Sequence, residues 1–331
     1  DYFNTVLYTG TSAEQAVTVG FQPDFTWIKQ RNGSASSSLA DAVRGAKERL
    51  FSDQSYAEST YAAGQGFESF DTDGFTVNVG AAVGTSGNTY VSWNWLASNT
   101  TATNSAGANG AAIASTYSAN TTSGFSVVSF TGTGANTTVF HGLGTAPKFM
   151  VIKSRTTVEP WLTYHGSLGG TQYLFLNQTS QANSNIAFFN NTNPTSAVFS
   201  LGNSAAGNTN AANYIAYCFA EVPGYSAFGS YEGNANNDGP FVYTGFRPSF
   251  LIVKSVDSTS DWLLIDNKRI GFNPDNEYME VNNANAEGTV NIVDFVSNGF
   301  KLRDRTADPN VAETYIYLAF AENPFKNSNA R

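Results

Sequence analysis

One string of this sequence occurs three times at fixed offsets. GFQPDFTWIKQR at Gly20–Arg31 returns as GTAPKFMVIKSR at Gly144–Arg155 and as GFRPSFLIVKSV at Gly245–Val256, which gives offsets of 124 and 101 residues. Separate blocks that keep one offset indicate duplicated units rather than chance similarity. A block at the end of each unit keeps these offsets, as Tyr90–Trp95 with Tyr214–Phe219 and Tyr315–Phe320, and a block at its start recurs at offsets of 122 and 101, as Tyr8–Gly10 with Phe130–Gly132 and Tyr231–Gly233.

The repeat predicts three homologous units, at 1–97, 124–221 and 223–326. Only Val222 and its neighbours separate the last two units, so we expect those two to pack closely against each other. Three similar units can pack around a pseudo-threefold axis or form a linear or bent array, and the repeat by itself allows either arrangement.

The segment between the first two units differs in composition from the rest. Residues 98–123 carry no charge and are almost all Ser, Thr, Asn, Ala and Gly, a composition typical of a linker. Ile113, Ser115 and Tyr117 alternate within it, so a leading strand of the second unit is the alternative.

Within each unit the pattern is that of β-structure. Apolar residues such as Phe25 and Trp27 alternate with others, and Gly, Asn and Asp clusters recur every ten or so residues. The segment 39–50 has helical periodicity, but its equivalents from Trp161 and from Trp262 are typical of strand, turn and strand. We therefore predict strand and turn there, and an all-β fold of three tandem homologous β-sandwich units of jelly-roll or lectin-like type.

Composition restricts the function classes. Charged residues make up 13% of the chain, against roughly 25% in ordinary soluble domains. The polar surface must therefore come from Asn, Ser, Thr and Gly, which suits an extracellular or virion protein. The net charge of −9 argues against a nucleic-acid partner, and no apolar stretch is long enough for membrane insertion as a helix. The single cysteine and two histidines exclude a disulfide framework and a Cys-rich or all-histidine metal site.

One polar constellation recurs in all three units. A lysine precedes a polar partner by twelve residues, as Lys29 with Asp41, Lys153 with His165, and Lys254 with Asp266. If each pair belongs to a hairpin, which in the first unit would turn near residue 35, its members can lie directly across the ladder. We predict a structural cross-strand contact in each unit.

Other conspicuous residues have structural explanations. The five tryptophans align with large apolar residues of the other units, as Trp27 does with Val151 and Ile252, so we predict that they are core residues rather than sugar platforms. Asp71–Gly74 resembles the opening of a calcium loop, but its equivalents lack the carboxylates, which predicts a β-turn.

Catalytic motifs are missing from the sequence. His141 aligns with Val17 and Val242, which indicates an edge substitution in a turn, and no G-x-S-x-G elbow or phosphate-binding glycine loop accompanies either histidine. We therefore predict no enzymatic activity, no cofactor and no metal site.

Several longer strings carry a resemblance to a known family. They are the DYFNT start, D-x-V-R-G at Asp41–Gly45, SFDTDGF at Ser69–Phe75, HGLGTAPKFMVIKSR from His141, YIAYCFAEVPGYSAFGSYEGN from Tyr214 and the closing AFAENPFKNSNAR. Over essentially its whole length the chain resembles a family of repeat proteins abundant in marine tailed bacteriophages. The resemblance implies a virion structural protein, of a kind described as tail-fibre-like or as a domain of unknown function.

The expected function follows from the composition together with the resemblance. We expect a non-enzymatic virion appendage on the exterior or tail of the particle, which engages a host surface glycan or protein. Its other partners would be virion proteins and further copies of itself, with a trimer expected by analogy with other fibres. The alternatives are a capsid decoration or fibre-forming assembly protein and, third, a carbohydrate-active enzyme, which requires a carboxylate pair in one cleft.

Overall fold

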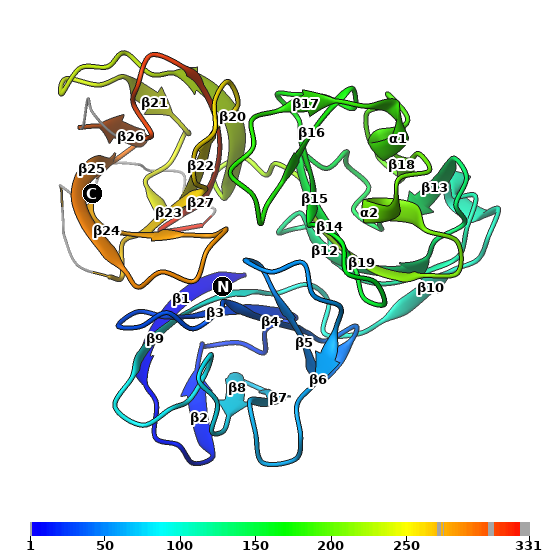
Figure 1. Cartoon of the computed structure of the whole chain (residues 1–331), viewed down its shortest axis with the longest axis horizontal. Coiled ribbons are helices and arrows are strands. Elements are labelled where there is room, and N and C mark those ends of the chain that lie inside the picture. Colours follow the sequence, from blue (N-terminus) through cyan, green and yellow to red (C-terminus); the bar gives the residue numbers. More distant parts are fainter. Residues whose placement is uncertain (1, 270–272, 274, 304–307, 325–331) are drawn as a thin grey trace.

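The computed structural model describes residues 2–269, 273, 275–303 and 308–324. The chain is nearly all β, with 46% of it in strands and 4% in helices, which confirms the predicted all-β class. Figure 1 shows three lobes around a common centre, and we call them lobe 1 (2–97), lobe 2 (98–222) and lobe 3 (223–324). None of the described helices is long and apolar enough to cross a membrane.

Lobe 1 consists of two antiparallel sheets. The main sheet has the order β1-β9-β3-β4-β5-β6, and a smaller sheet, β2-β8-β7, packs on its outer face. Ile28, Phe67 and Phe75 lie in the core between the two sheets. The strands are β1 (Phe3–Thr9), β2 (Gln15–Thr18), β3 (Phe25–Gln30), β4 (Ser38–Asp41), β5 (Gly45–Phe51), β6 (Ser59–Thr60), β7 (Phe67–Asp71), β8 (Gly74–Val77) and β9 (Thr89–Trp95).

Lobe 2 has the same two layers and adds short helices. Its main sheet has the order β10-β11-β12-β19-β14-β15-β16-β17, with β13-β18 as the second sheet. The elements are β10 (Ala102–Asn104), η1 (Ala108–Gly110), β11 (Ser115–Asn120), β12 (Phe125–Thr131), β13 (Thr137–Phe140), β14 (Phe149–Ser154), β15 (Leu162–His165), β16 (Gln172–Phe175), β17 (Asn183–Ser184), α1 (Ile186–Phe189), β18 (Val198–Leu201), α2 (Ala205–Asn208) and β19 (Asn213–Phe219).

Lobe 3 joins its layers into one sheet. The order is β20-β27-β22-β23-β24-β25-β26-β21, and its far end folds back, so that Val242 and Phe300 share a core with Leu251. The strands are β20 (Ser226–Glu232), β21 (Phe241–Tyr243), β22 (Pro248–Ser255), β23 (Leu263–Asp266), β24 (Asp275–Glu280), β25 (Gly288–Val296), β26 (Gly299–Leu302) and β27 (Thr314–Ala321).

The central strands have the same neighbours in each lobe. β3 lies between β9 and β4, β14 between β19 and β15, and β22 between β27 and β23. Strands at the repeat offsets therefore occupy equivalent positions in the three main sheets. The register agrees as well, because the cross-strand pairs Trp27–Trp93, Val151–Tyr217 and Ile252–Leu318 are related by the offsets of the repeat.

The central strand of each main sheet is buried on both faces, and this explains its composition. All six residues of β3 are buried, because Trp27 faces the centre of the molecule while Ile28 faces the core of lobe 1. A strand covered on both sides does not show the polar and apolar alternation of a half-exposed strand.

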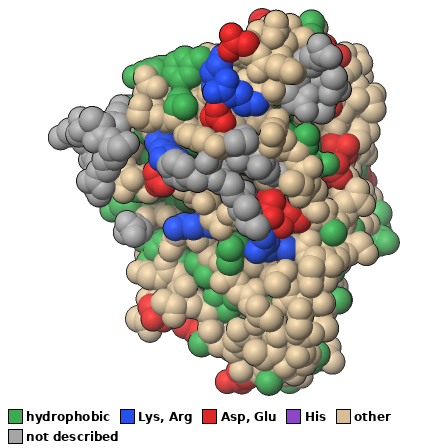
Figure 2. Space-filling model, turned by 90° about the vertical axis from the view of Figure 1, so that its left-hand side faces the viewer, with side chains coloured by type: hydrophobic (Ala, Val, Ile, Leu, Met, Phe, Trp, Pro, Cys, Tyr) green, Lys and Arg blue, Asp and Glu red, His purple; other side chains and the backbone are tan. Residues whose placement is uncertain are grey.

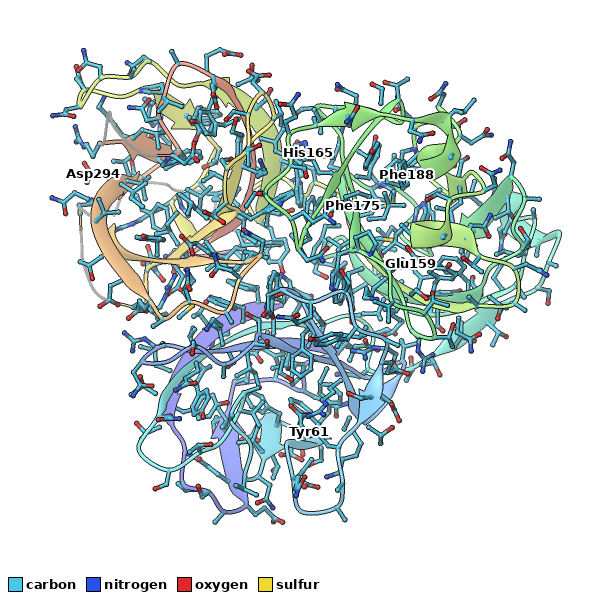
Figure 3. The ribbon with its side chains drawn as sticks, viewed as in Figure 1. Tyr61, Glu159, His165, Phe175, Phe188 and Asp294 are labelled. Carbon is cyan, nitrogen blue, oxygen red and sulfur yellow. The ribbon has the colours of Figure 1, made fainter. Side chains whose placement is uncertain are left out.

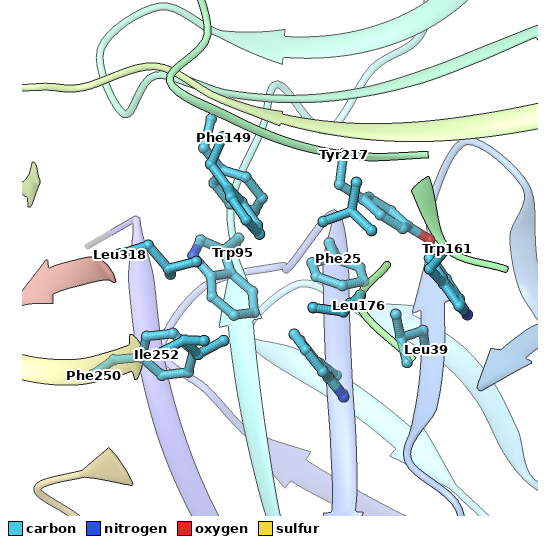
Figure 4. Close-up of a pocket in the computed structure, with 13 residues that line it drawn as sticks. Phe25, Leu39, Trp95, Phe149, Trp161, Leu176, Tyr217, Phe250, Ile252 and Leu318 are labelled. Carbon is cyan, nitrogen blue, oxygen red and sulfur yellow. The ribbon is translucent and has the colours of Figure 1, made fainter. Parts of the chain in front are cut away.

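A common core joins the three lobes. Trp95 lies 5.3 Å from Phe25 of its own lobe, 5.9 Å from Phe219 of lobe 2 and 5.7 Å from Phe320 of lobe 3, between ring centres. All five tryptophans belong to this core, which confirms the prediction that they are packing residues. Figure 4 shows its centre, an apolar cavity of about 30 Å³ with lining residues from all three lobes.

The segment 39–50 forms strand, turn and strand, as predicted, and is not a helix. β4 ends at Asp41 and β5 begins at Gly45, whose φ of 107° lies in the region that favours glycine. The carboxylate of Asp41 accepts a hydrogen bond from the backbone N–H of Arg44 at 2.8 Å, which closes the turn. Leu39 and Leu50 of the two strands lie opposite each other in the common core.

Residues 98–123 are not a linker. β11 pairs with β12 over six residues and β10 pairs with β11, so the segment extends the main sheet of lobe 2. The alternative of a leading strand is therefore correct. The uncharged Ser and Thr side chains that suggested a linker also suit a strand at the edge of a sheet.

Candidate functional site

The predicted lysine pairs are not formed across the ladder. Phe25, not Lys29, lies across from Asp41, and Phe149 and Phe250 likewise lie across from His165 and Asp266. The pairs Phe25–Asp41 and Ile28–Ser38 centre the first hairpin on residue 33 rather than near residue 35. Lys29 is therefore four residues along the strand from the partner of Asp41, and the predicted contacts of Lys153 with His165 and of Lys254 with Asp266 are wrong for the same reason.

The three lysines instead bind carbonyl and hydroxyl oxygens of loops. Each is at most 1% exposed, and each ammonium group donates to the carbonyl oxygen of the following residue. Two of them also reach another lobe. The further acceptors include Ala35 O (2.9 Å) and Ala284 O (3.0 Å) for Lys29, Ser55 O (3.3 Å) for Lys153, and Ser260 Oγ (3.1 Å) for Lys254.

These buried lysines predict that the protein becomes more stable as the pH rises above neutrality. Burial lowers the pKa of Lys29, Lys153 and Lys254 to about 8 from an ordinary value of 10.5. Between those pH values the unfolded chain binds more protons than the folded chain, so the free energy of unfolding increases with pH. We expect a gain of about 1 kcal/mol for each lysine between pH 7 and pH 9, measured by thermal unfolding.

A matched variant isolates the lysine contribution. Lys153→Met removes one titrating group, so the free energy of unfolding should increase less between pH 7 and pH 9 than it does in the parent chain. An unfolding temperature that is equal at pH 7 and pH 9 in the parent chain would contradict the prediction.

The other members of the predicted pairs, Asp41, His165 and Asp266, bind a neighbouring lobe. Asp41 of lobe 1 binds lobe 2, His165 of lobe 2 binds lobe 3, and Asp266 of lobe 3 binds lobe 1. Each lobe therefore binds the next one in the same order around the molecule. The hydrogen bonds are Tyr217 Oη to Asp41 Oδ2 (2.7 Å), Trp93 Nε1 to Asp266 Oδ2 (3.0 Å) and His165 Nε2 to the carbonyl oxygen of Tyr317 (3.0 Å).

We call the three lobe boundaries the 1–2, 2–3 and 3–1 seams. An equivalent backbone hydrogen bond occurs at each of them, from a segment after the β4–β5 hairpin or its equivalent to the residue that follows the strand corresponding to β3. These bonds are Glu58 N to Arg155 O (2.9 Å), Ala182 N to Val256 O (3.0 Å) and Glu287 N to Arg31 O (2.9 Å). The lobes therefore form a closed ring rather than a linear array.

The 1–2 seam contains a buried charge network. Arg44 contacts Asp41 and lies 3.0 Å from Glu58, and the side chains of Arg44 and Asp41 are fully buried. Glu58 also binds Arg155 of lobe 2 at 2.7 Å. Burial opposes the charge of Arg44, but Asp41, Tyr217 and Glu58 together raise its pKa above the ordinary value. The guanidinium group is therefore held in its charged form.

The 3–1 seam repeats this network. Arg269 lies 2.7 Å from Asp266 and 3.2 Å from Glu287, which in turn binds Arg31 of lobe 1 at 2.9 Å. Sequence reasoning missed both networks. The signal that reveals them is the spacing Asp-x-x-Arg, which occurs at Asp41 and again at Asp266.

The 2–3 seam has uncharged residues at the equivalent positions. They are His165, Leu168, Ala182 and Val256. Burial lowers the pKa of His165 to about 4, so the imidazole is neutral near pH 7. Leu168 packs against the common core, and Figure 3 shows His165 at the boundary of lobes 2 and 3. Two charged seams and one neutral seam thus distinguish the lobes.

A groove of about 260 Å³ opens on lobe 1, beside β5. None of its lining residues is acidic, although the chain has 26 acidic residues. Figure 2 shows one face of the molecule on which charged side chains occur in small mixed groups among uncharged polar surface. The groove is lined by Ala35, Ser36, Arg49, Phe51, Tyr61, Gln65 and residues 79–82.

Arg49 is the only charged side chain in this lining. Its guanidinium carbon lies 4.4 Å from the ring centre of Tyr61 and 5.4 Å from that of Phe51, within the range of cation–π attraction. Its Nε–H donates to Ser59 Oγ at 2.7 Å. Among the arginines that the structure describes, Arg49 alone has no carboxylate partner.

The walls of the groove are held in place by neighbouring contacts. The hydroxyl group of Tyr61 lies 3.3 Å from Ser38 Oγ. A Cβ atom on Gly66 would lie 2.2 Å from the Tyr61 ring, so only glycine leaves room for it. Gln65 and Val79, which both line the groove, form a β-bridge that holds their two segments together. The groove is therefore preformed.

Lobe 2 has aromatic rings where lobe 1 has this arginine. Tyr173 precedes the core residue Leu174 as Arg49 precedes Leu50. The Tyr173 ring lies 3.9 Å from Phe188, which also lies 5.6 Å from Phe175. Figure 3 shows Phe175 and Phe188 in lobe 2 and Tyr61 in lobe 1. The unpaired cation is thus a feature of lobe 1 rather than of the shared strand pattern.

The remaining sequence candidates have structural roles. Asp71 accepts hydrogen bonds from Ser69 and Thr76, both at 2.7 Å, in the β7–β8 turn, which confirms the turn prediction. The part of the chain that the structure describes contains no cluster of three metal-ligating side chains. His141 is fully buried and lies 3.1 Å from the carbonyl oxygen of Thr195.

The alignment of His141 with Val17 and Val242 is shifted by two residues. Val139 lies across from Phe199, as Val17 lies across from Phe75 and Val242 from Phe300. His141 therefore follows the equivalent strand instead of replacing its apolar residue.

Comparison with known proteins identifies a family. A family model described as "Domain of unknown function (DUF7483)" matches residues 1–324, a range that includes all three lobes. No curated protein matches the chain.

Proposed function

The chain belongs to the DUF7483 family, and for this member we propose a role as a non-enzymatic structural protein of a bacteriophage virion. It would be a tail-fibre-like appendage on the outside of the particle, and it would bind a glycan on the host surface. The observation that carries the proposal is the preformed groove of lobe 1 with its unpaired arginine. The resemblance to virion proteins of marine phages supports the same interpretation.

The chemistry of the groove favours binding over catalysis. Arg49, Ser36 and Gln65 supply hydrogen-bonding groups, and Phe51 and Tyr61 supply apolar surface. Small-ligand sites commonly combine an apolar lining with a few polar groups in this way. A glycosidase needs two carboxylates at the cleft, and this lining has none. The groove therefore suits a sugar that is held without being cleaved.

Blocking the groove tests the proposal. Ala81 is an exposed residue of the lining, and Ala81→Trp should fill the groove without disturbing the core. Saturable binding of the purified chain to host cells is expected to fall at least tenfold in this variant, because the added indole occupies the volume of the ligand.

An equivalent position in lobe 2 provides the control. The carbonyl oxygen of Ala205 accepts a hydrogen bond from Tyr214, as that of Ala81 does from Tyr90, and Ala205 is also exposed. Ala205→Trp should bind cells like the parent chain. Equal binding by both variants would remove the groove from the proposal, and no saturable binding by the parent chain would overturn the receptor-binding role itself.

The closed ring of lobes favours capsid decoration as a second candidate. Three lobes joined by the same backbone contact at each seam give one chain approximate threefold symmetry, which matches the local symmetry of threefold positions on a capsid. Quantitative protein composition of purified particles separates the two roles, because an appendage is present in few copies and a decoration protein in hundreds. Either role involves contacts with other virion proteins, and the fibre role includes the trimer expected by analogy.

A further inference from the structure

The groove of lobe 1 provides a positive charge without a counter-ion. The Nε–H of Arg49 is taken up by Ser59, so the N–H groups of the two terminal nitrogens have no protein acceptor among the described residues. In the described arginines other than Arg49, the guanidinium group binds a carboxylate of the protein itself. A guanidinium group with free terminal N–H groups is well matched to two oxygens of an anion.

The aromatic rings fix the position of this charge. Tyr61 is 8% exposed and lies beneath the guanidinium group at 4.4 Å, with Phe51 at 5.4 Å. Stacking restricts the arginine to one orientation, so less side-chain entropy is lost when a ligand binds. The volume of about 260 Å³ is close to the lower limit of small-ligand sites, roughly 300 Å³, and fits one or two sugar residues.

We infer that the groove binds an acidic saccharide, with Arg49 as the residue that recognises its carboxylate or sulfate group. This inference rests on the proposed glycan-binding function and specifies the class of ligand. The anionic group lies against the terminal nitrogens of Arg49. The sugar ring contacts Phe51 and the exposed side chain of Val79, and its hydroxyl groups lie within reach of Ser36 and Gln65.

Calorimetric titration of the full chain with three oligosaccharides tests this assignment. The probes are an oligogalacturonate, the same oligosaccharide with its carboxyl groups reduced, and a sulfated galactan fragment. At least one anionic probe is expected to bind ten times or more tightly than the reduced one. Arg49→Gln should abolish that difference, whereas Lys268→Gln, which removes an exposed charge from lobe 3, should leave it unchanged.

The outcomes distinguish the ligand class from the binding function. If Ala81→Trp prevents binding to cells while Arg49→Gln does not weaken it, the groove binds a neutral ligand and the acidic class is wrong. If neither anionic probe binds more tightly than the reduced oligosaccharide, the inference is overturned even when the parent chain binds host cells. A circular dichroism spectrum of Arg49→Gln that matches the parent spectrum verifies that the variant is folded.

Discussion

Arg44→Leu is expected to lower the free energy of unfolding by about 3 kcal/mol or more, because it leaves the carboxylate of Asp41 buried without a cation. The side chains of both residues are fully buried at the 1–2 seam. The substitution also removes one of the two partners of Glu58. Urea unfolding curves at pH 7 measure the difference, and the midpoint should fall with little change in slope.

Converting the whole seam should reverse this loss. The 2–3 seam shows that histidine, leucine, alanine and valine fit the equivalent positions, as His165, Leu168, Ala182 and Val256. A chain with Asp41→His, Arg44→Leu, Glu58→Ala and Arg155→Val together should be more stable than Arg44→Leu alone, because no buried charge is left unpaired. If the free energy of unfolding of Arg44→Leu alone were within about 1 kcal/mol of that of the parent chain, the charge network would not be important for stability.

Trp95→Ala is expected to cost about 3–5 kcal/mol, the range for removing a large buried side chain. Trp95 is 2% exposed and contacts aromatic rings of all three lobes. Trp95→Ala should therefore destabilise the whole chain rather than lobe 1 alone. The variant should still unfold in a single transition. Urea unfolding followed by circular dichroism and by fluorescence tests this, since both signals should move together.

Trp95→Phe is the matched control. Phenylalanine occupies the equivalent positions in the other lobes, as Phe219 and Phe320. The indole N–H of Trp95 has no hydrogen-bond partner within the described residues, so replacing the indole removes a buried polar group that contributes nothing. We expect a cost below about 1.5 kcal/mol. Two separate unfolding transitions in Trp95→Ala would show that the lobes fold independently, contrary to the prediction.

Much of the fold was accessible from the repeat. The segment 39–50 has helical periodicity, and only its equivalents from Trp161 and Trp262 indicated the observed strands β4 and β5. The repeat also predicts the tryptophans to be core residues, because large apolar residues stand at the same positions in the other units, and all five are buried. In both cases a second copy of the same position supplied information that local periodicity lacks.

The candidate site was not accessible in this way. Arg49 is unusual because it lacks a carboxylate partner, and partners become visible only when strands and loops are placed in space. The aligned residue Tyr173 suggests an ordinary position of the strand. Tyr61, which supports the guanidinium group, comes from a loop that the repeat does not match.

The sequence by itself determined that the chain is all β, that the central strands recur at the repeat offsets and that the tryptophans lie in the core. The tertiary structure decided what those residues contact. The spacing of Lys29 and Asp41 predicts a contact between the two side chains, but Asp41 binds Tyr217 of lobe 2 and Lys29 binds the carbonyl oxygen of Ala284 in lobe 3. The physical reason is that strand periodicity reports which face of a sheet is buried, whereas the partner across a seam depends on how three sheets close around one core.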